Sequence, residues 1–140
     1  MSLAKLQNTT IMSTELSHAR LKHLAIKFGV TEDIVSRLAL GLSIRDGKVS
    51  NEWIPTKIES ETLQEVTTGK SLRGKTLFKH ELPLWMMLLS KAEGRIDSIE
   101  DVRSKFVLHW ERGIELIAEK DNQDDWIHLI ASIYPPQDSQ

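Results

Sequence analysis

The sequence predicts a small, mainly α-helical domain with a tight N-terminal αα corner and a loop-rich basic arm. Proline and glycine are scarce among the 140 residues, at 4 and 7, which favours long regular elements. Apolar residues recur at intervals of three and four over most of the chain, as they do on the buried face of a helix. Hydrophobic residues make up 40% and charged residues 27%, a balance typical of folded globular proteins.

A chain of this length is expected to form one domain. We predict a single helical domain over residues 14–134, preceded by an N-terminal arm or short strand over 1–13 and followed by a polar tail over 135–140. Within the arm, Lys5, Gln7 and Thr9 alternate as groove-facing residues of a strand would. A ribbon-helix-helix-like arrangement is therefore one form that the N-terminal part is predicted to take.

The first helix is predicted over residues 14–29. Its apolar residues follow the spacing of one buried face: Leu21, Leu24, Ala25 and Phe28. Gly29 is placed to end this helix, and Thr31 to cap the start of a second helix that extends to about Ile44. Two helices joined by about two residues must meet at a tight αα corner.

Residues 46–80 are predicted to form an irregular connection with one helical turn near Glu59–Glu65. Trp53 and Ile54 are expected to anchor it against the core. Its last part, residues 69–80, is the basic arm, which holds four Lys or Arg and no acid. We expect a short strand at Thr76–Phe78.

Three further helices are predicted after the basic arm. Pro83 suits the first turn of a helix that is apolar on almost every side through Leu84–Leu89, so this helix lies at the domain centre or in a subunit interface. After Gly94, Asp97 with Glu100 matches a capping box at the start of the next helix. The apolar positions of this fourth helix are Ile99, Val102, Phe106, Trp110, Ile114 and Ile117, and its opposite face carries Glu100, Asp101, Glu111, Glu115 and Glu119. A fifth helix is predicted from about Asn122 to Tyr134.

Several function classes are disfavoured by the sequence. The absence of cysteine excludes persulfide, disulfide and thiolate-metal chemistry in this chain. Gly69-Lys70-Ser71 lacks the first glycine of a P-loop, since Gln64 stands there. The histidines show no metal-site spacing, and His109 is expected to be a buried structural residue. We therefore predict a protein that is not an enzyme and has no metal or cofactor. The sequence also contains neither a membrane-length apolar run nor a signal-peptide core, so we expect a cytoplasmic location.

Charge divides the chain into two unequal halves. Residues 1–80 hold 12 of the 18 Lys and Arg but 8 of the 20 Asp and Glu, whereas residues 81–140 hold 6 and 12. This asymmetry points to an anionic partner at one end of the molecule, although two charged surfaces that only confer solubility are an equal alternative. The basic residues suited to phosphate contacts are Arg20, Lys22, Lys27, Lys70, Arg73, Lys75 and Lys79.

Residues 20–47 resemble the opening of the DndE family, the small subunit of the bacterial DNA sulfur-modification (phosphorothioation) system. The matching residues are Leu21-Lys22, Leu24, Gly29-Val30-Thr31, Ile34, Arg37–Leu40 and Leu42-Ser43. A second match runs from Gly74-Lys75-Thr76-Leu77 through Glu81 into the apolar helix. The chain departs from the family pattern at two places: Glu32-Asp33 stands where the family has Pro-Asn, and Lys75 stands where it has an arginine.

The resemblance implies a helical homo-oligomer, a tetramer, that binds double-stranded DNA with a preference for nicked DNA. Such a subunit works beside other subunits of the DNA sulfur modification machinery, which replaces a non-bridging phosphate oxygen by sulfur. Trp85 and Met86, in the apolar helix, are the expected subunit contacts. Two alternatives remain: a ribbon-helix-helix transcriptional regulator, and a scaffold subunit that docks an acidic protein.

Overall fold

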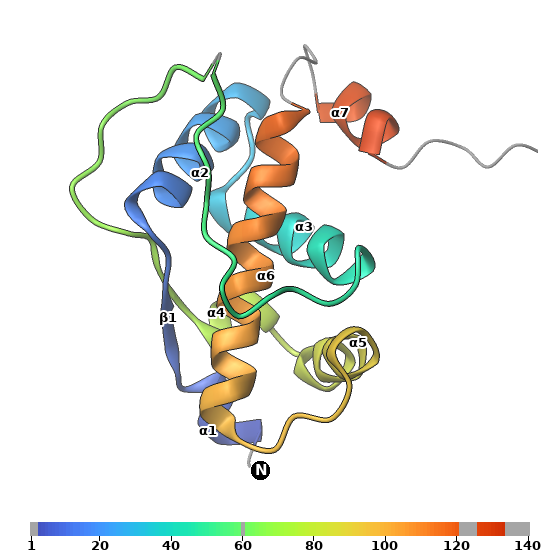
Figure 1. Cartoon of the computed structure of the whole chain (residues 1–140). Helices are drawn as coiled ribbons and strands as arrows, with labels where there is room; N and C mark the ends of the chain where they lie inside the picture. The colour runs from blue at the N-terminus through green and yellow to red at the C-terminus, as the bar shows by residue number, and fades with distance from the viewer. Residues whose placement is uncertain (1–2, 60, 121–125, 134–140) are drawn as a thin grey trace, which may run out of the picture.

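The computed structural model describes residues 3–59, 61–120 and 126–133, and it confirms the mainly α-helical fold (Figure 1). The elements are, in chain order, α1 (Leu3–Gln7), β1 (Thr10–Met12), α2 (Glu15–Phe28), α3 (Glu32–Arg45), β2 (Ser71–Arg73), α4 (Gly74–Phe78), α5 (Leu82–Glu93), α6 (Ile99–Glu119) and α7 (Trp126–Ile133).

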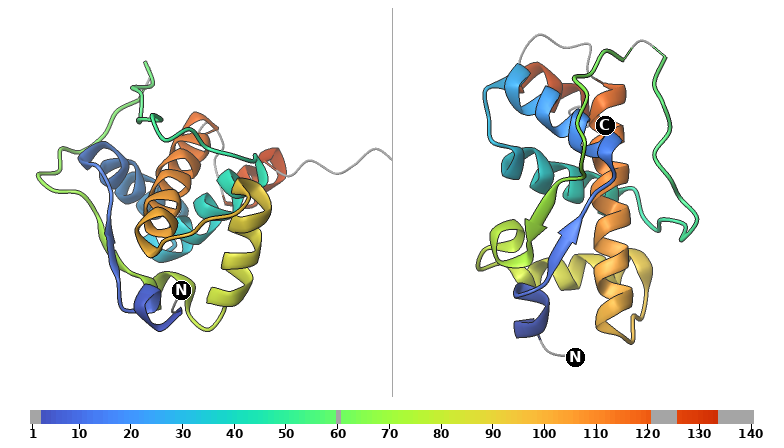
Figure 2. Two further views of the ribbon diagram at one scale, coloured as in Figure 1. Left: turned by 60° about the horizontal axis from the view of Figure 1, so that its bottom comes forward. Right: turned by 90° about the vertical axis from the view of Figure 1, so that its left-hand side faces the viewer.

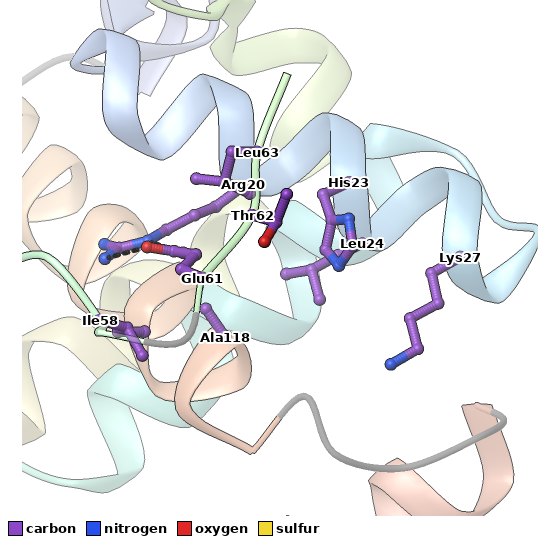
Figure 3. Close-up of a pocket in the computed structure, with 9 residues that line it drawn as sticks. All are labelled: Arg20, His23, Leu24, Lys27, Ile58, Glu61, Thr62, Leu63 and Ala118. Carbon is purple, nitrogen blue, oxygen red and sulfur yellow. Dashed lines mark hydrogen bonds and ion pairs between the residues drawn. The ribbon is translucent and has the colours of Figure 1, made fainter. Parts of the chain in front are cut away.

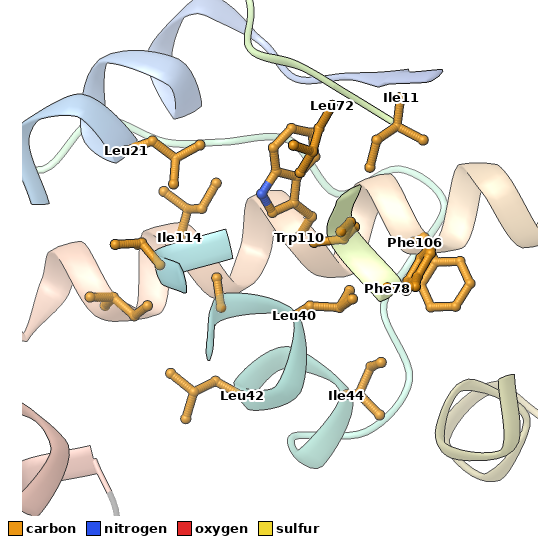
Figure 4. Packing of buried hydrophobic residues seen from close by; sticks show 14 of the residues in the cluster. Ile11, Leu21, Leu40, Leu42, Ile44, Leu72, Phe78, Phe106, Trp110 and Ile114 are labelled. Atoms are coloured by element: carbon orange, nitrogen blue, oxygen red, sulfur yellow. The ribbon is translucent and has the colours of Figure 1, made fainter. Parts of the chain in front are cut away.

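Helix α6 runs through the centre of the domain and packs against both α2 and α3 (Figures 1 and 4). Phe106, Trp110 and Ile114 on its inner face have no exposed surface. The Phe78 ring of α4 lies 4.7 Å from the Phe106 ring, centroid to centroid, in a tilted arrangement that aromatic pairs favour. The predicted apolar stripe therefore forms the centre of the core from Val102 to Ile117.

The αα corner forms as predicted. The Thr31 hydroxyl accepts a hydrogen bond from the Ile34 N–H and caps α3, and Gly29 ends α2 in the left-handed conformation. Pro83 lies in the first turn of α5. The capping box at Asp97 is wrong by one residue: the α6 cap is Ser98, whose hydroxyl accepts from the Asp101 N–H.

The N-terminal arm differs from the prediction. Residues 3–7 are helical, so Lys5 and Gln7 do not alternate along a strand. The strand lies at Thr10–Met12 instead and pairs antiparallel with β2, with Ile11 opposite Leu72 (Figure 2). In a ribbon-helix-helix protein this strand would pair with its copy in a second subunit. Here β1 pairs with β2 of the same chain, an arrangement that differs from the ribbon-helix-helix-like form predicted for the N-terminal part.

The basic arm is also built differently. The strand predicted at Thr76–Phe78 is wrong, because these residues belong to α4 and the strand precedes them. A Cβ at Gly69 would lie 1.8 Å from the Ser13 carbonyl oxygen, and one at Gly74 would lie 2.4 Å from that of Leu6. Both glycines thus allow the N-terminal arm to lie directly against the basic arm.

Residues 48–59 and 61–70, which we call the strap, form a long loop that passes over α6 and α2 (Figure 1). The helical turn predicted at Glu59–Glu65 is wrong for the described residues of that stretch. Val49 is fully buried and anchors the strap, whereas Ile54, which was predicted to do so, is 69% exposed. Of the predicted fifth helix, α7 is observed, while residues 122–125 and Tyr134 lie outside the described residues, as does the tail.

Within the described residues, no helix has both the length and the apolar character needed to cross a membrane.

Gly113 provides a test of the contact between α3 and α6. A Cβ at this position would lie 1.7 Å from the Ala39 carbonyl oxygen, so Gly113→Ala must push the two helices apart. We expect this variant to lose about 3 kcal/mol of unfolding free energy or more, measured by urea denaturation.

Gly41→Ala is the matched control. Gly41 also lies inside a helix, but its Cβ would meet only the Trp85 ring, at an ordinary 3.8 Å. Because alanine favours helix over glycine by up to about 1 kcal/mol, this variant should be unchanged or more stable. Equal losses in the two variants would contradict the close approach of α3 and α6.

Candidate nucleic-acid interface

Five basic side chains from separate segments gather at the end of the molecule formed by α1, β2 and α4. We call this set the basic end: Lys5, Arg73, Lys75, Lys79 and His80. All five residues are exposed, and none of their side chains has a hydrogen-bond or ion-pair partner among the described residues. Pairing of β1 with β2 and packing of α1 on α4 bring Lys5 to the residues of the basic arm. Glu81 is the single acid of the sequence between residues 66 and 92.

Sequence reasoning identified three of these residues and missed two. Arg73, Lys75 and Lys79 were predicted as phosphate contacts, and the fold places them together. Lys5 was assigned to a strand, so its place beside the basic arm became visible only from the packing of α1 on α4. His80 directly follows Lys79 in the sequence, and that adjacency was the available signal.

Lys70 lies apart from the basic end. Its ammonium is 3.4 Å from a carboxylate oxygen of Glu32 in the first turn of α3, and its side chain is 24% exposed. The His18 ring lies 3.7 Å from the same oxygen and contacts the Thr68 carbonyl oxygen at 2.8 Å. These contacts fasten the end of the strap to α2 and α3, so Lys70 has a structural role in this conformation.

Arg20 is a correction to the sequence prediction. Its side chain is fully buried, so it does not face a phosphate. The guanidinium donates to Glu61 of the strap at 2.7 Å, to Glu115 of α6 at 3.1 Å, and to the Thr56 carbonyl oxygen. Sequence spacing placed Arg20 beside the apolar face of α2 but gave no sign of the two carboxylates that come from distant segments.

Lys22 and Lys27 line a groove between α2 and residues 62–64 of the strap. Figure 3 shows the part of this groove that Lys27 lines. Lys27 is exposed, and its ammonium lies 5.4 Å from the centre of the Phe28 ring. In the ribbon views α2 and α4 occupy different ends of the domain (Figures 1 and 2). The predicted basic residues therefore form two separate surfaces, the basic end and the α2 groove.

Trp85 and Met86 of α5 are both half-buried and pack against the core of their own chain. The Trp85 ring lies 6.4 Å from that of Phe78. The exposed stripe of α5 consists instead of Leu84, Met87 and Leu88, which are 51%, 70% and 37% exposed.

A buried polar network joins α3, α5 and α6. The Ser43 hydroxyl and the Glu93 carboxylate each lie 2.8 Å from one ring nitrogen of His109, an arrangement that resembles a Ser–His–acid triad. Ser43 and His109, however, have no exposed surface, and Arg112 donates to the Ser43 oxygen at 2.8 Å. The network is therefore structural, as the sequence led us to expect for His109.

Burial lowers the pKa of His109, and the neighbouring Glu93 only partly opposes this shift. Burial alone would raise the pKa of Glu93. Hydrogen bonds from the Val49 N–H, from Lys105 and from His109 outweigh that effect and hold the pKa below its ordinary value. At neutral pH the pair is a neutral imidazole that donates to a carboxylate.

Comparison with known proteins decides the family. The family described as DNA sulphur modification protein DndE matches residues 11–125, most of the chain. The chain belongs to the DndE family. No curated protein sequence matches it significantly. Among solved structures it is similar to the crystal structure of DndE from Escherichia coli B7A involved in DNA phosphorothioation modification. The sequence identity is 19%, the TM-score is 0.50, and the match covers 75% of this chain and 91% of that chain. At this identity the similarity shows a shared fold.

The DndE resemblance is carried by residues at two places in the structure. Gly29-Val30-Thr31 makes the corner between α2 and α3, and residues 74–77 make most of α4 beside the basic end. One departure from the family pattern, Glu32, is the carboxylate that holds Lys70 and His18. Over the described parts of this DndE chain, no cluster of three His, Asp or Glu side chains has the geometry to hold a metal ion.

The His109–Glu93 pair predicts how stability depends on pH. Both pKa values are lower in the folded than in the unfolded chain, so the unfolded chain binds more protons in acid. Unfolding free energy should be highest above pH 6.5, fall as His109 of the unfolded chain is protonated below that value, and fall again below pH 4.5 through Glu93. Urea denaturation at pH 7.5, 5.5 and 4.0 measures this.

His109→Gln serves as the control, because it removes the imidazole titration but leaves Glu93 in place. We expect it to be less stable than the wild type at pH 7.5 and to lose less stability between pH 7.5 and 5.5. A wild-type protein that is equally stable at these two pH values would contradict the role assigned to His109.

Proposed function

We propose that this DndE-family chain is a non-catalytic DNA-binding subunit of phosphorothioate modification. In this proposal the basic end contacts the phosphates of a DNA duplex, with a preference for nicked DNA, while other subunits of the modification machinery supply the sulfur chemistry. The observation that carries the proposal is the gathering of Lys5, Arg73, Lys75, Lys79 and His80 at one exposed end. Cationic side chains without protein partners suit phosphate binding, which releases counterions from DNA.

A non-catalytic role is supported by the sequence. The chain has no cysteine to carry a persulfide, and Gln64 replaces the glycine that a P-loop requires. The Ser43–His109–Glu93 arrangement has no exposed nucleophile. We propose that the purified chain neither hydrolyses ATP nor cuts DNA.

We also propose that the chain acts as a homo-oligomer, a tetramer, and that the outer stripe of α5 is a subunit contact. Leu84, Met87 and Leu88 are spaced at i, i+3 and i+4, so three exposed apolar side chains lie along one face of the helix. Exposed apolar stripes of this kind are typical of protein interfaces. We propose these three residues as the subunit contact in place of Trp85 and Met86, because Trp85 and Met86 pack against the core of their own chain.

The DNA prediction concerns salt dependence. Arg73→Ala/Lys75→Ala removes two exposed charges of the basic end, so the slope of log affinity against log salt on duplex DNA should fall by roughly 1–2 units. Fluorescence anisotropy on intact and nicked duplexes of one sequence, each at two salt concentrations, measures both the slope and the preference for a nick. Binding should weaken equally on duplexes of unrelated sequence.

Lys57→Ala/Lys120→Ala is the matched control. It removes the same charge from exposed lysines near the opposite end of α6 and should leave the slope almost unchanged. Equal slopes for both double variants would show that the basic end is not the DNA surface, and the α2 groove with Lys22 and Lys27 would be the next candidate. A wild-type chain without DNA affinity would favour the alternative of docking to an acidic protein.

The oligomer prediction concerns the α5 stripe. Leu84→Glu/Met87→Glu places charges on a face that we expect to be buried between subunits, so the variant should dissociate to smaller species while keeping its helical circular dichroism spectrum. Light scattering at micromolar concentration measures the mass. A wild-type monomer under these conditions would refute the interface.

A further inference from the structure

The turn between α4 and α5 has an unusual backbone conformation. Lys79 has φ 54° and ψ −126° and is the single non-glycine residue with positive φ among those described. The N–H of Glu81 donates to the Phe78 carbonyl oxygen at 2.9 Å, so residues 78–81 form a closed β-turn. These angles belong to the first central position of a type II′ turn, which glycine normally occupies.

A lysine at this position strains the backbone, because its Cβ crowds the neighbouring peptide groups. The fold requires a sharp turn here, since Phe78 and Leu82 on either side are both buried in the core. Glycine would make the same turn without strain. The Lys79 side chain is exposed and has no hydrogen-bond or ion-pair partner in the described parts of the chain, so no such contact offsets the cost.

The same turn places Lys79 favourably for binding. Its N–H donates to the Lys75 carbonyl oxygen at 3.2 Å, so the two lysines lie one turn of chain apart. Lys75 is itself exposed, and His80 follows at the tip. Residues held in strained conformations tend to occur at binding sites, where the contact that they make with a ligand justifies the strain.

We propose that Lys79 is a principal phosphate contact of the bound duplex and that the fold gives up stability to present it. This inference rests on the proposed DNA-binding function and names the residue on which that function depends most. The inference predicts that replacing Lys79 by glycine increases the stability of the fold and weakens DNA binding at the same time.

Three substitutions at this position separate the strain from the charge. Lys79→Gly removes both the strain and the charge. Loss of the strain should raise Tm by about 3–6 °C. Loss of the charge should lower duplex affinity about fivefold to tenfold at roughly 0.1 M salt and reduce the salt slope by about 0.9. Lys79→Ala keeps the strain and removes the charge, so it should lose the same affinity with Tm nearly unchanged. Lys79→Arg keeps both and should resemble the wild type. Lys57→Ala controls for loss of an exposed lysine elsewhere.

The results can separate failure of the Lys79 inference from failure of the proposed DNA-binding function. Salt-dependent binding by the wild type together with unchanged affinity and slope in Lys79→Gly would overturn the inference and leave DNA binding in place. A Lys79→Gly variant no more stable than Lys79→Ala would overturn the claim of strain. Failure of the wild type itself to bind intact or nicked duplex would overturn the proposed function and, with it, this inference.

Discussion

The conformation of the strap depends on the Glu115 carboxylate of α6. This side chain is almost fully buried and accepts hydrogen bonds from the Thr56 N–H, at 2.6 Å, and from Arg20, at 3.1 Å. Glu111, one turn earlier, accepts from the Thr14 N–H at 2.6 Å at the entrance to α2. Removal of one partner from such a buried pair typically costs about 3–5 kcal/mol, because the other charge is left without compensation. One face of α6 thus holds the strap and the start of α2 through hydrogen bonds to its carboxylates, while its apolar face forms part of the core.

The basic end depends indirectly on these contacts of the strap with α6. The strap leads directly into β2, and β2 can pair with β1 only because Gly69 and Gly74 let the two backbones approach closely. α1 and α4 then pack together and bring Lys5 to the basic arm. A surface made of five basic side chains is therefore assembled from three short elements, none of which is stable alone, and the turn that follows α4.

This DndE-family chain has one group of charged side chains that is buried and hydrogen-bonded and another that is exposed. Arg20, Glu111, Glu115 and the His109–Glu93 pair are enclosed and satisfied, and they stabilise the fold. The cations of the basic end are exposed and have no partners among the described residues, so they contribute little to stability. This separation is what a nucleic-acid interface requires, since phosphate contacts need cations that the protein itself does not neutralise.

Local signals in the sequence were enough to predict helices α2, α3, α5, α6 and α7, the αα corner and the core stripe of α6, but not α1 or α4. These signals are apolar spacing, the Thr31 cap, Gly29 and Pro83. The sequence also placed Arg73, Lys75 and Lys79 in one arm. The burial of Arg20, the position of the strand at residues 10–12 and the place of Lys5 in the basic end could be seen only in the folded chain. Each of these depends on a partner far away in the chain, such as Glu115 for Arg20 and β2 for β1, and local spacing carries no information about which distant segment will supply it.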